Sequence, residues 1–338
     1  MICWAHDSYR SADMAFGKGK SSSHSTDNPW LSKLLLVPVL LVLLILLLVG
    51  WYWSQEPGLE PVAGAPKADQ VSGEYTARTV RGLVVTLLDK PGGYLSNDIM
   101  PPGLLMDNMP RWEYGVLVQV RDMTRALRRD MARSQSQSTE DRDLVKAEPR
   151  FHFDHNSWAM PASESEYRDG VKALDSYIAR LGQGQANFYS RADNLSSWVS
   201  DVSTRLGSLS QRLSASVGRA PLTDGGKLGE TTPWLEIDDV FYEARGTSWA
   251  LVQLLRAVEH DFGDVLEKKN ALVSLQQIIR ELEATQQTLW SPMVLNGDGF
   301  GMLANHSLVM ANYLSRANAG LIELHRLLNR ADTWINNS

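Results

Sequence analysis

Residues Leu34 to Trp53 read LLLVPVLLVLLILLLVGWYW, an unbroken apolar run. At about 1.5 Å per residue, a helix of this length crosses a hydrocarbon layer of about 30 Å. A core helix without a polar face would need apolar partners on every side. Trp30 and the Trp51–Trp53 cluster flank the run, where membrane interfaces favour aromatic rings. The run therefore predicts a transmembrane helix over residues 31–53, which contacts the lipid bilayer through Leu34–Trp53.

A cleaved signal peptide is the alternative interpretation of this run. Signal peptides have an apolar core of about 7–15 residues that is closely followed by small residues. Here the run is longer, and the nearest pattern of small residues, Ala63-Gly64-Ala65, lies well beyond it. We therefore expect an uncleaved, single-pass anchor.

The orientation of the anchor follows from the flanking cations. Lys18, Lys20 and Lys33 precede the span within a short distance, whereas Lys67 alone follows it within a comparable distance. Because lysine and arginine stay on the cytoplasmic side, we predict a cytoplasmic N-terminus and an exported C-terminal part.

Composition limits the partners of the exported part. The net charge is −6, and residues 1–53 carry four basic side chains against three aspartates, which leaves −7 for the remainder. An acidic domain without a long basic run is not expected to bind nucleic acid. The one cysteine is Cys3, so the exported part has neither disulfides nor a cysteine nucleophile, as suits a domain of a bacterial periplasm.

The chain divides into four predicted segments. Residues 1–30 lack apolar periodicity and predict a short, disordered cytoplasmic tail. Residues 31–53 are the anchor. Residues 54–70 are rich in proline, glycine and alanine and predict a linker that lifts the domain off the membrane. Residues 71–338 form the predicted periplasmic domain.

Helical periodicity dominates residues 71–338. Apolar residues recur three and four apart in residues 80–88, and a helix predicted to continue to Met131 begins near Trp112. Ser163 and Glu166 have the spacing of a capping box. Two long loops are predicted between these helices, over residues 94–112 and 149–163.

Three stretches carry a seven-residue apolar rhythm, and convincing strands are missing. The pattern is typical of long helices packed at shallow angles. We therefore predict an all-α fold, an elongated helical bundle with coiled-coil-like seams, for which a homo-oligomer is one option. The three apolar seams are Ala192, Leu195, Val199, Val202, Leu206, Leu209 and Leu213; Ile237, Phe241, Ala244, Ser248, Leu251, Leu255, Val258 and Phe262, in a helix opened by Thr232 and Pro233; and Met310, Leu314, Ala317, Leu321, Leu324, Leu328 and Ala331.

Motifs for catalysis or cofactor binding are not convincing. His152, Asp154 and His155 are weak metal candidates, because a zinc site needs three or four converging ligands and no further ligand is evident. Gly297–Gly301 reads GDGFG but lacks the Lys-Ser/Thr of a phosphate loop, so a connector is the favoured interpretation. Neither Gly-x-Ser-x-Gly nor Ser-x-x-Lys occurs. We predict no catalytic residue and no cofactor.

Two groups of residues are candidates for binding. The loop over residues 94–112 mixes large apolar with hydrogen-bonding side chains, as protein interfaces do, although its apolar members would also fit into the end of the bundle. A stripe of arginines could contact an anionic surface or form a salt-bridged face. The loop candidates are Met106, Asp107, Asn108, Met109 and Trp112, and the arginine candidates are Arg121, Arg125, Arg128 and Arg129.

Several segments together resemble a known family. They are LLDKPGGYLSND, PRWEYGVLVQVRD, ARSQSQSTEDRDL, FYSRADNL, RLGSLSQRLSASVG and ANHSLVMANYLSRANA. They resemble a family of proteobacterial inner-membrane proteins catalogued as a domain of unknown function, over about Gly50 to the C-terminus. The resemblance implies an inner-membrane location of the gammaproteobacterial type, in Gram-negative bacteria, and carries no activity or site residue.

Two functions of different classes fit these observations. The favoured hypothesis is a membrane-tethered periplasmic scaffold or adaptor of the cell envelope that binds envelope proteins and is not an enzyme. The alternative is a cell-envelope hydrolase with a site formed by loops 94–112 and 149–163.

The orientation prediction is tested with a reporter fusion. Alkaline phosphatase fused after Ser338 should be active, because that enzyme folds only outside the cytoplasm, and the mature protein should retain Met1–Gly50. An inactive fusion, or a soluble periplasmic product, would contradict the predicted topology.

Overall fold

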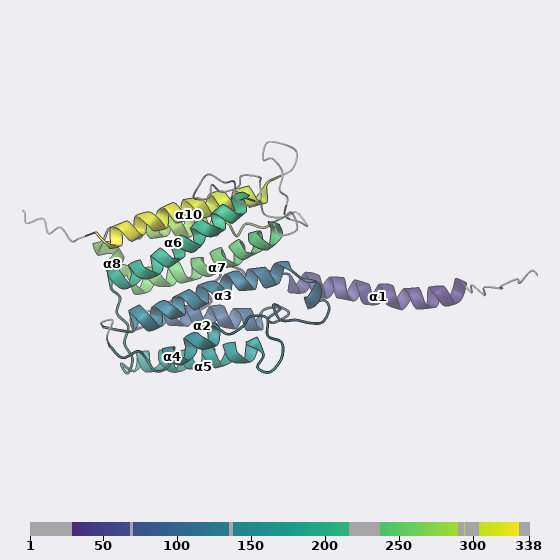
Figure 1. The fold of residues 1–338 in the computed structure, drawn as a ribbon, viewed down its shortest axis with the longest axis horizontal. Coiled ribbons are helices and arrows are strands. Elements are labelled where there is room, and N and C mark those ends of the chain that lie inside the picture. Colours follow the sequence, from purple (N-terminus) through teal and green to yellow (C-terminus); the bar gives the residue numbers. More distant parts are fainter. Residues whose placement is uncertain are drawn as a thin grey trace, which may run out of the picture. The chain divides into compact units, whose positions relative to one another are not determined.

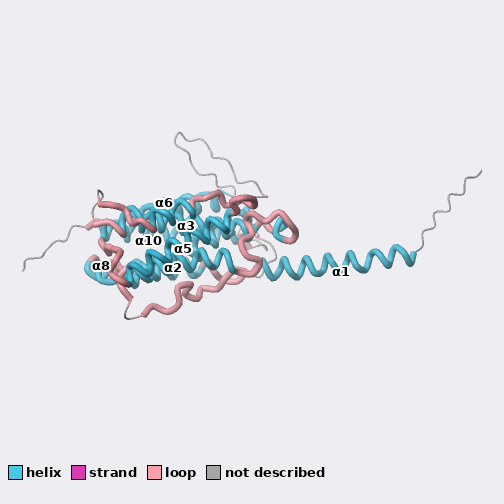
Figure 2. Tube along the Cα trace, turned by 90° about the horizontal axis from the view of Figure 1, so that it is seen from below, coloured by secondary structure: helices cyan, strands magenta, loops and turns pink. Residues whose placement is uncertain are grey.

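The computed structural model describes residues 29–67, 70–134, 138–215, 237–289, 294 and 304–330. Residues 1–28 of the predicted N-terminal tail, the helix start at Thr232 and Pro233, Gly297–Gly301 and Ala331 lie outside these residues. In the described part every regular element is helical, which confirms the predicted all-α class (Figure 2). The elements are α1 (Pro29–Trp53), α2 (Glu74–Asp89), the 3₁₀ turn η1 (Gly103–Leu105), α3 (Asn108–Ala126), the π-helical turn η2 (Leu127–Met131), α4 (Leu144–Phe151), α5 (Ser163–Gly182), α6 (Ala192–Ala215), α7 (Ile237–Asp261), α8 (Gly263–Lys268), α9 (Leu272–Ala284) and α10 (His306–Leu328).

Helix α1 is one long apolar helix. It contains Pro38, and its side chains from Leu36 to Trp53 are not buried in the structure. Its length and composition are sufficient to cross a membrane, as the sequence predicts. By contact the chain divides into two units, Met1–Ile45 and Leu46–Ser338, and the second contains all the other helices.

The helices of the second unit pack around α3 and α7. Figure 1 shows α10 and α6, then α7, α3 and α2, and finally α4 and α5, with their axes close to parallel. Helix α7 is buried on most of its circumference rather than along one face, including the whole stretch 244–255. The seam predicted for this helix is therefore part of a larger buried surface, and α7 is the central helix of the body.

The predicted apolar seams form the core. Leu206 on α6 and Leu321 on α10 are both fully buried, and α6 packs directly against α10. Apolar residues spaced three and four apart lie on one face of a helix, so their spacing in the sequence predicts which side chains are buried. Other buried seam residues are Leu195, Val199, Val202, Leu209, Leu213, Met310, Leu314, Ala317, Leu324 and Leu328.

Helices α3 and α7 approach until their backbones touch. A Cβ added at Gly115 would lie 2.2 Å from the carbonyl oxygen of Glu243, and one added at Gly246 would lie 2.0 Å from that of Trp112. The Trp112 ring then packs on Trp249 with centroids 5.1 Å apart. Glycine is needed at both positions because any side chain would force the two helices apart.

The segment after α1 is not a free linker, which corrects the role expected for residues 54–70. We call residues 54–67 the strap, and its residues 56–62 lie along α7. Trp249 Nε1 donates to the carbonyl of Gly58 (2.8 Å), and Gln253 binds Glu60 O (3.1 Å) and Val62 N (3.3 Å). The strap also passes α2 at Gly82, where a Cβ would lie 2.6 Å from Val62 O.

A buried arginine fixes the start of the strap. Arg245 on α7 is 7% exposed, and its Nε lies 2.9 and 3.0 Å from the two carboxylate oxygens of Glu56. Its Nη1 donates to the carbonyls of Thr285 (3.1 Å) and Gln287 (3.0 Å). A buried guanidinium needs such a complete set of acceptors, so Glu56 is held by α7 and the end of α9.

The start of α5 differs from the predicted capping box. The residue before the helix is Ala162, which has no capping side chain. The Ser163 hydroxyl instead donates to Asp154 O (2.7 Å) and Ser157 O (3.1 Å), and Glu166 forms an ion pair with Arg150. Ser163 therefore closes the preceding loop rather than the helix.

The contact between α3 and α7 predicts the effect of Gly246→Ala. Alanine in place of glycine inside a helix normally stabilises by about 0.5–1 kcal/mol. Here the new methyl would collide with backbone, so we expect a loss of about 1–3 kcal/mol of unfolding free energy. Denaturant unfolding of the full chain in detergent measures this loss of unfolding free energy.

The matched control is Gly263→Ala, where no atom beyond the adjoining residues and the helix's own backbone lies within 4 Å of the added Cβ. This variant should be no less stable than the parent. Equal stability of the two variants would show that α3 and α7 do not touch at Gly246.

Candidate functional site

The loop between α2 and α3 is anchored by a buried ion pair. Lys90 Nζ lies 2.7 Å from Glu113 Oε1, and the two side chains are 1% and 0% exposed. Lys90 also donates to the carbonyl of Gly93 at 2.6 Å. The end of α2 is thereby tied to the first turns of α3.

Glu113 also holds the next residues of this loop. Its carboxylate accepts from the amides of Leu95 (2.9 Å) and Ser96 (2.8 Å) and from the Ser96 hydroxyl (2.6 Å). Burial raises the pKa of the Glu113 carboxyl, and the Lys90 ammonium and these hydrogen bonds offset part of that rise. The role of Glu113 is structural, since these contacts with side chains and backbone amides hold residues 90–96 in place.

The second predicted loop, between α4 and α5, is bound to the first. Asn97 Nδ2 donates to Ser157 O (2.8 Å) and to Glu164 Oε2 (2.7 Å). The Tyr94 hydroxyl donates to the carbonyl of His155 (3.1 Å). The two loops predicted as a functional surface therefore form one structure, although α3 begins at Asn108 and α4 extends to Phe151.

A groove of about 680 Å³ lies where these loops meet α3, α6 and α7. Ion pairs connect Arg111 with Asp239 (2.8 Å) and Arg212 with Glu243 (2.8 Å). The groove is polar on most of its surface, and its cations are balanced by carboxylates. Its lining residues are Ser96, Met106, Asp107, Pro110, Arg111, Tyr114, His155, Asn156, Arg212 and Glu243.

His155 contributes an aromatic surface to the groove. Its ring packs on Tyr114 with centroids 5.0 Å apart. Burial, and then the charge of Arg121, lower the pKa of the His155 imidazole, so the neutral ring is favoured. A neutral, half-buried imidazole that packs at a tilt against a phenol is suited to packing and hydrogen bonding with a ligand.

The weak metal candidates do not converge. His152 Nδ1 lies 2.9 Å from Glu148 O, and its Nε2 lies 2.9 Å from Arg125 Nη2. His155 is directed at Tyr114, with Asp154 Oδ1 at 3.8 Å from its Nδ1. Among the described residues, no group of three or more His, Cys, Asp or Glu side chains is placed to hold a metal ion.

The predicted partner-binding residues divide between groove and core. Met106 and Asp107 line the groove, and Asp107 also accepts from the Asn108 amide at the start of α3. Met109 and Trp112 are buried, at 3% and 0% exposure, which removes them from the predicted surface. The reason is the earlier start of α3, which places both side chains in the core, where the Trp112 ring packs on Trp249 of α7.

Three of the four predicted arginines join α3 and the following turn η2 to α4. Arg121 donates to the carbonyls of Phe151 (2.7 Å) and Phe153 (2.9 Å), at the carboxyl end of α4. Arg125 and Arg128 both pair with Glu148, Arg128 at 2.7 Å. Cations are favoured at a helix C-terminus, where carbonyls lack partners. The stripe is therefore largely an internal salt-bridged face, and Arg129 is its exposed member.

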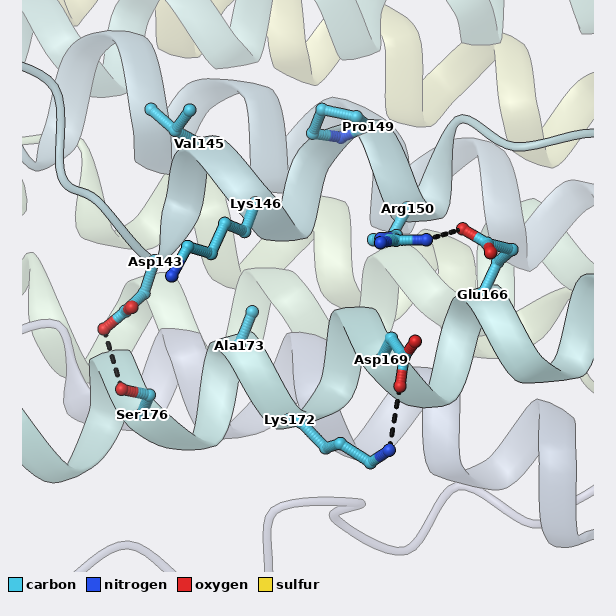
Figure 3. A pocket seen from close by; sticks show the side chains of 10 residues that line it. All are labelled: Asp143, Val145, Lys146, Pro149, Arg150, Glu166, Asp169, Lys172, Ala173 and Ser176. Atoms are coloured by element: carbon cyan, nitrogen blue, oxygen red, sulfur yellow. Dashed lines mark hydrogen bonds and ion pairs between the residues drawn. The ribbon is translucent and has the colours of Figure 1, made fainter.

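A second hollow, of about 690 Å³, lies between α4 and α5 (Figure 3). Arg150 pairs with Glu166, Lys172 lies 2.8 Å from Asp169, and the Ser176 hydroxyl donates to Asp143 at 2.8 Å. Its carboxylates are thus engaged with neighbouring side chains. The arrangement stabilises the α4–α5 contact and offers no free acid–base pair.

Comparison with known proteins identifies a family. The family model described as an uncharacterized protein conserved in bacteria (DUF2333) matches residues 24–331. No curated protein and no solved structure matches the chain.

The buried ion pair predicts a large effect for Lys90→Met. This change leaves the Glu113 carboxylate buried without its cation, which typically costs about 3–5 kcal/mol. Lys90→Met combined with Glu113→Gln should recover part of the loss, since no charge is then buried alone. Urea unfolding of the full chain in detergent measures both.

Arg81→Met is the control, because Arg81 and Asp175 form an exposed pair at 2.6 Å. Loss of this exposed ion pair should lower the free energy of unfolding by less than about 1 kcal/mol. If Lys90→Met and Arg81→Met lowered the free energy of unfolding by equally small amounts, the structure would not depend on the buried Lys90–Glu113 pair.

Proposed function

The chain belongs to this bacterial DUF2333 family, and we propose that it is a membrane-tethered periplasmic scaffold or adaptor of the cell envelope. In this proposal α1 crosses the inner membrane with the N-terminus in the cytoplasm. The helical body lies in the periplasm and binds an envelope protein. The protein acts by holding its partner at the membrane rather than by catalysis.

The membrane placement is supported by α1 and its flanks. The helix is long and apolar enough to span a bilayer, and lysines are more frequent before it than after it. The absence of cysteine from residues 4–338 suits a domain that folds by packing in a periplasm.

The groove between the two loops carries the proposal of binding. It combines the packed Tyr114–His155 rings, the half-buried Met106 and balanced charges at Arg111 and Glu243. Aromatic, methionine and arginine side chains are enriched at protein interfaces. The Lys90–Glu113 pair keeps the rim in place, which limits the entropy lost on binding.

The hydrolase alternative lacks an observation of comparable weight. In the groove, the Ser96 hydroxyl donates to the buried Glu113 rather than to a histidine. A serine does contact a histidine between α6 and α10, where Ser196 Oγ lies 2.9 Å from His325 Nδ1. The Ser196 hydroxyl oxygen accepts a hydrogen bond from the Asn329 side-chain amide (2.7 Å), and Ser196 is 3% exposed. A nucleophile needs an accessible oxygen, which Ser196 does not have.

Photocrosslinking in cells tests the proposed interface. A photoreactive amino acid at Asn156, an exposed lining residue, should give discrete adducts with a periplasmic or membrane protein. Arg111→Glu should reduce their yield about tenfold, as expected when a charge reversal costs about 1.4 kcal/mol of binding.

Arg191→Glu is the matched control, because Arg111 and Arg191 have equally exposed side chains (52%) and each forms one ion pair, with Asp239 and Asp193. It should leave the adducts unchanged. Absence of adducts at Asn156, or equal loss in both variants, would overturn the proposed interface.

A further inference from the structure

Among the described residues outside α1, the densest group of exposed apolar side chains lies in the loop between α2 and α3. Ile99, Met100, Leu104 and Leu105 fall within seven residues and are each more than half exposed. Single exposed apolar residues are common on proteins, but a cluster of this kind marks an interaction surface. We call residues 99–105 the apolar loop.

The apolar loop lies beside the last turns of α1. A Cβ built on Gly50 would be 3.6 Å from Cβ of Pro102. Three residues later, the Trp53 ring packs on Gly92, where an added Cβ would lie 2.7 Å from the indole. Since the apolar run ends at Trp53, a spanning α1 places Gly50 at the boundary of the hydrocarbon layer. Pro102 is therefore at the same boundary.

We infer that the apolar loop inserts into the outer interface of the bilayer, as a second lipid contact beside α1. This inference rests on the membrane anchoring in the proposed function. We assign lipid as the binding partner of the apolar loop because the loop lies directly beside the lipid-facing end of α1. The helical body is then attached to the bilayer at two points, which restricts its rotation about α1.

The backbone of the apolar loop is suited to an apolar medium. Unpaired amides are costly in lipid. The amides of Leu104, Leu105 and Met106 donate to Met100 O (3.0 Å), Pro102 O (2.9 Å) and Gly103 O (2.9 Å). Pro101 and Pro102 have no N–H to satisfy. Four of the seven residues of the apolar loop, Pro101, Pro102, Leu104 and Leu105, therefore present no free amide to the lipid.

The charges near the tip are compatible with insertion. Residues 91–110 contain no lysine or arginine, and their acidic residues are Asp98 and Asp107. The Asp98 side chain packs against Gly103, where a Cβ would lie 2.2 Å from its Oδ2, and its burial raises the pKa of this carboxyl. Asp107 lies in the groove at the start of α3. Asp98 precedes the apolar loop and Asp107 follows it, so no charged residue lies between Ile99 and Leu105.

Lipid quenching in vesicles tests the inference on the full chain. An environment-sensitive fluorophore is attached at Leu105→Cys in a Cys3→Ser background, and the protein is reconstituted with phosphatidylethanolamine and phosphatidylglycerol. We expect a blue-shifted emission that bromine-labelled lipids quench by at least about half. Val273→Cys on α9 is the matched control, since Leu105 and Val273 are 75% and 73% exposed. The emission of the fluorophore at Val273→Cys should be neither blue-shifted nor quenched by the bromine-labelled lipids.

Leu44→Cys, inside α1, separates failure of the inference from failure of the anchoring. Quenching at Leu44 without quenching at Leu105 would overturn the lipid contact and leave the anchor intact. Quenching at neither position would overturn the anchoring and the inference with it. Equal quenching at Leu105 and Val273 would also overturn the inference, because contact would not be specific to the loop.

Discussion

The salt bridge between Arg245 and Glu56 determines how the helical body is joined to its apolar helix. Arg245 is buried in the central helix, and Glu56 is the third residue after α1. A buried guanidinium without its carboxylate is strongly unfavourable, so the strap is held as long as α7 is folded. The hydrogen bonds of Trp249 and Gln253 to Gly58, Glu60 and Val62 extend the same contact. The segment that follows α1 is therefore a structural part of the body.

Docking of the strap has a consequence for the two loops. A flexible linker would let the body sample many positions relative to the end of α1. With the strap in place, Trp53 is packed on Gly92 and Gly50 is beside Pro102. The Lys90–Glu113 pair fixes the same loop from the other side. In the proposed function, this arrangement holds the groove at a constant height above the bilayer and keeps the apolar loop at the bilayer interface.

The core was predictable from sequence because it depends on local periodicity. The seams of α6 and α10 and the apolar length of α1 follow from residues three, four and seven apart. The strap was not predictable in this way, since its partners are about 190 residues distant in the chain. Its composition suggests a linker, but its backbone carbonyls are acceptors that Trp249 and Gln253 satisfy. Gly115 and Gly246 were missed for a similar reason, because close helix approach leaves no periodic signal.

The candidate site was predicted in outline and corrected in detail. Both loops were expected, and they meet in the groove. Met109 and Trp112 belong to the loop predicted over residues 94–112, whereas α3 begins at Asn108 and accepts Pro110 in its first turn. The arginine stripe was visible, but its partners on α4, such as Glu148, lie across a tertiary contact. The isolated lysine at the end of α2 and Glu113 on an apolar face were signals that could have indicated the buried pair.

Docking of the strap is tested most directly by a distance measurement between two spin labels. Cys3 is the one native cysteine, so Cys3→Ser with Glu60→Cys and Lys172→Cys places the labels on the strap and on α5. Both positions are exposed. Pulsed electron resonance of the protein in lipid nanodiscs should give one narrow distance distribution, and Arg245→Gln should broaden it. A broad, coil-like distribution in the parent protein would show that the strap is a free linker and would contradict the account.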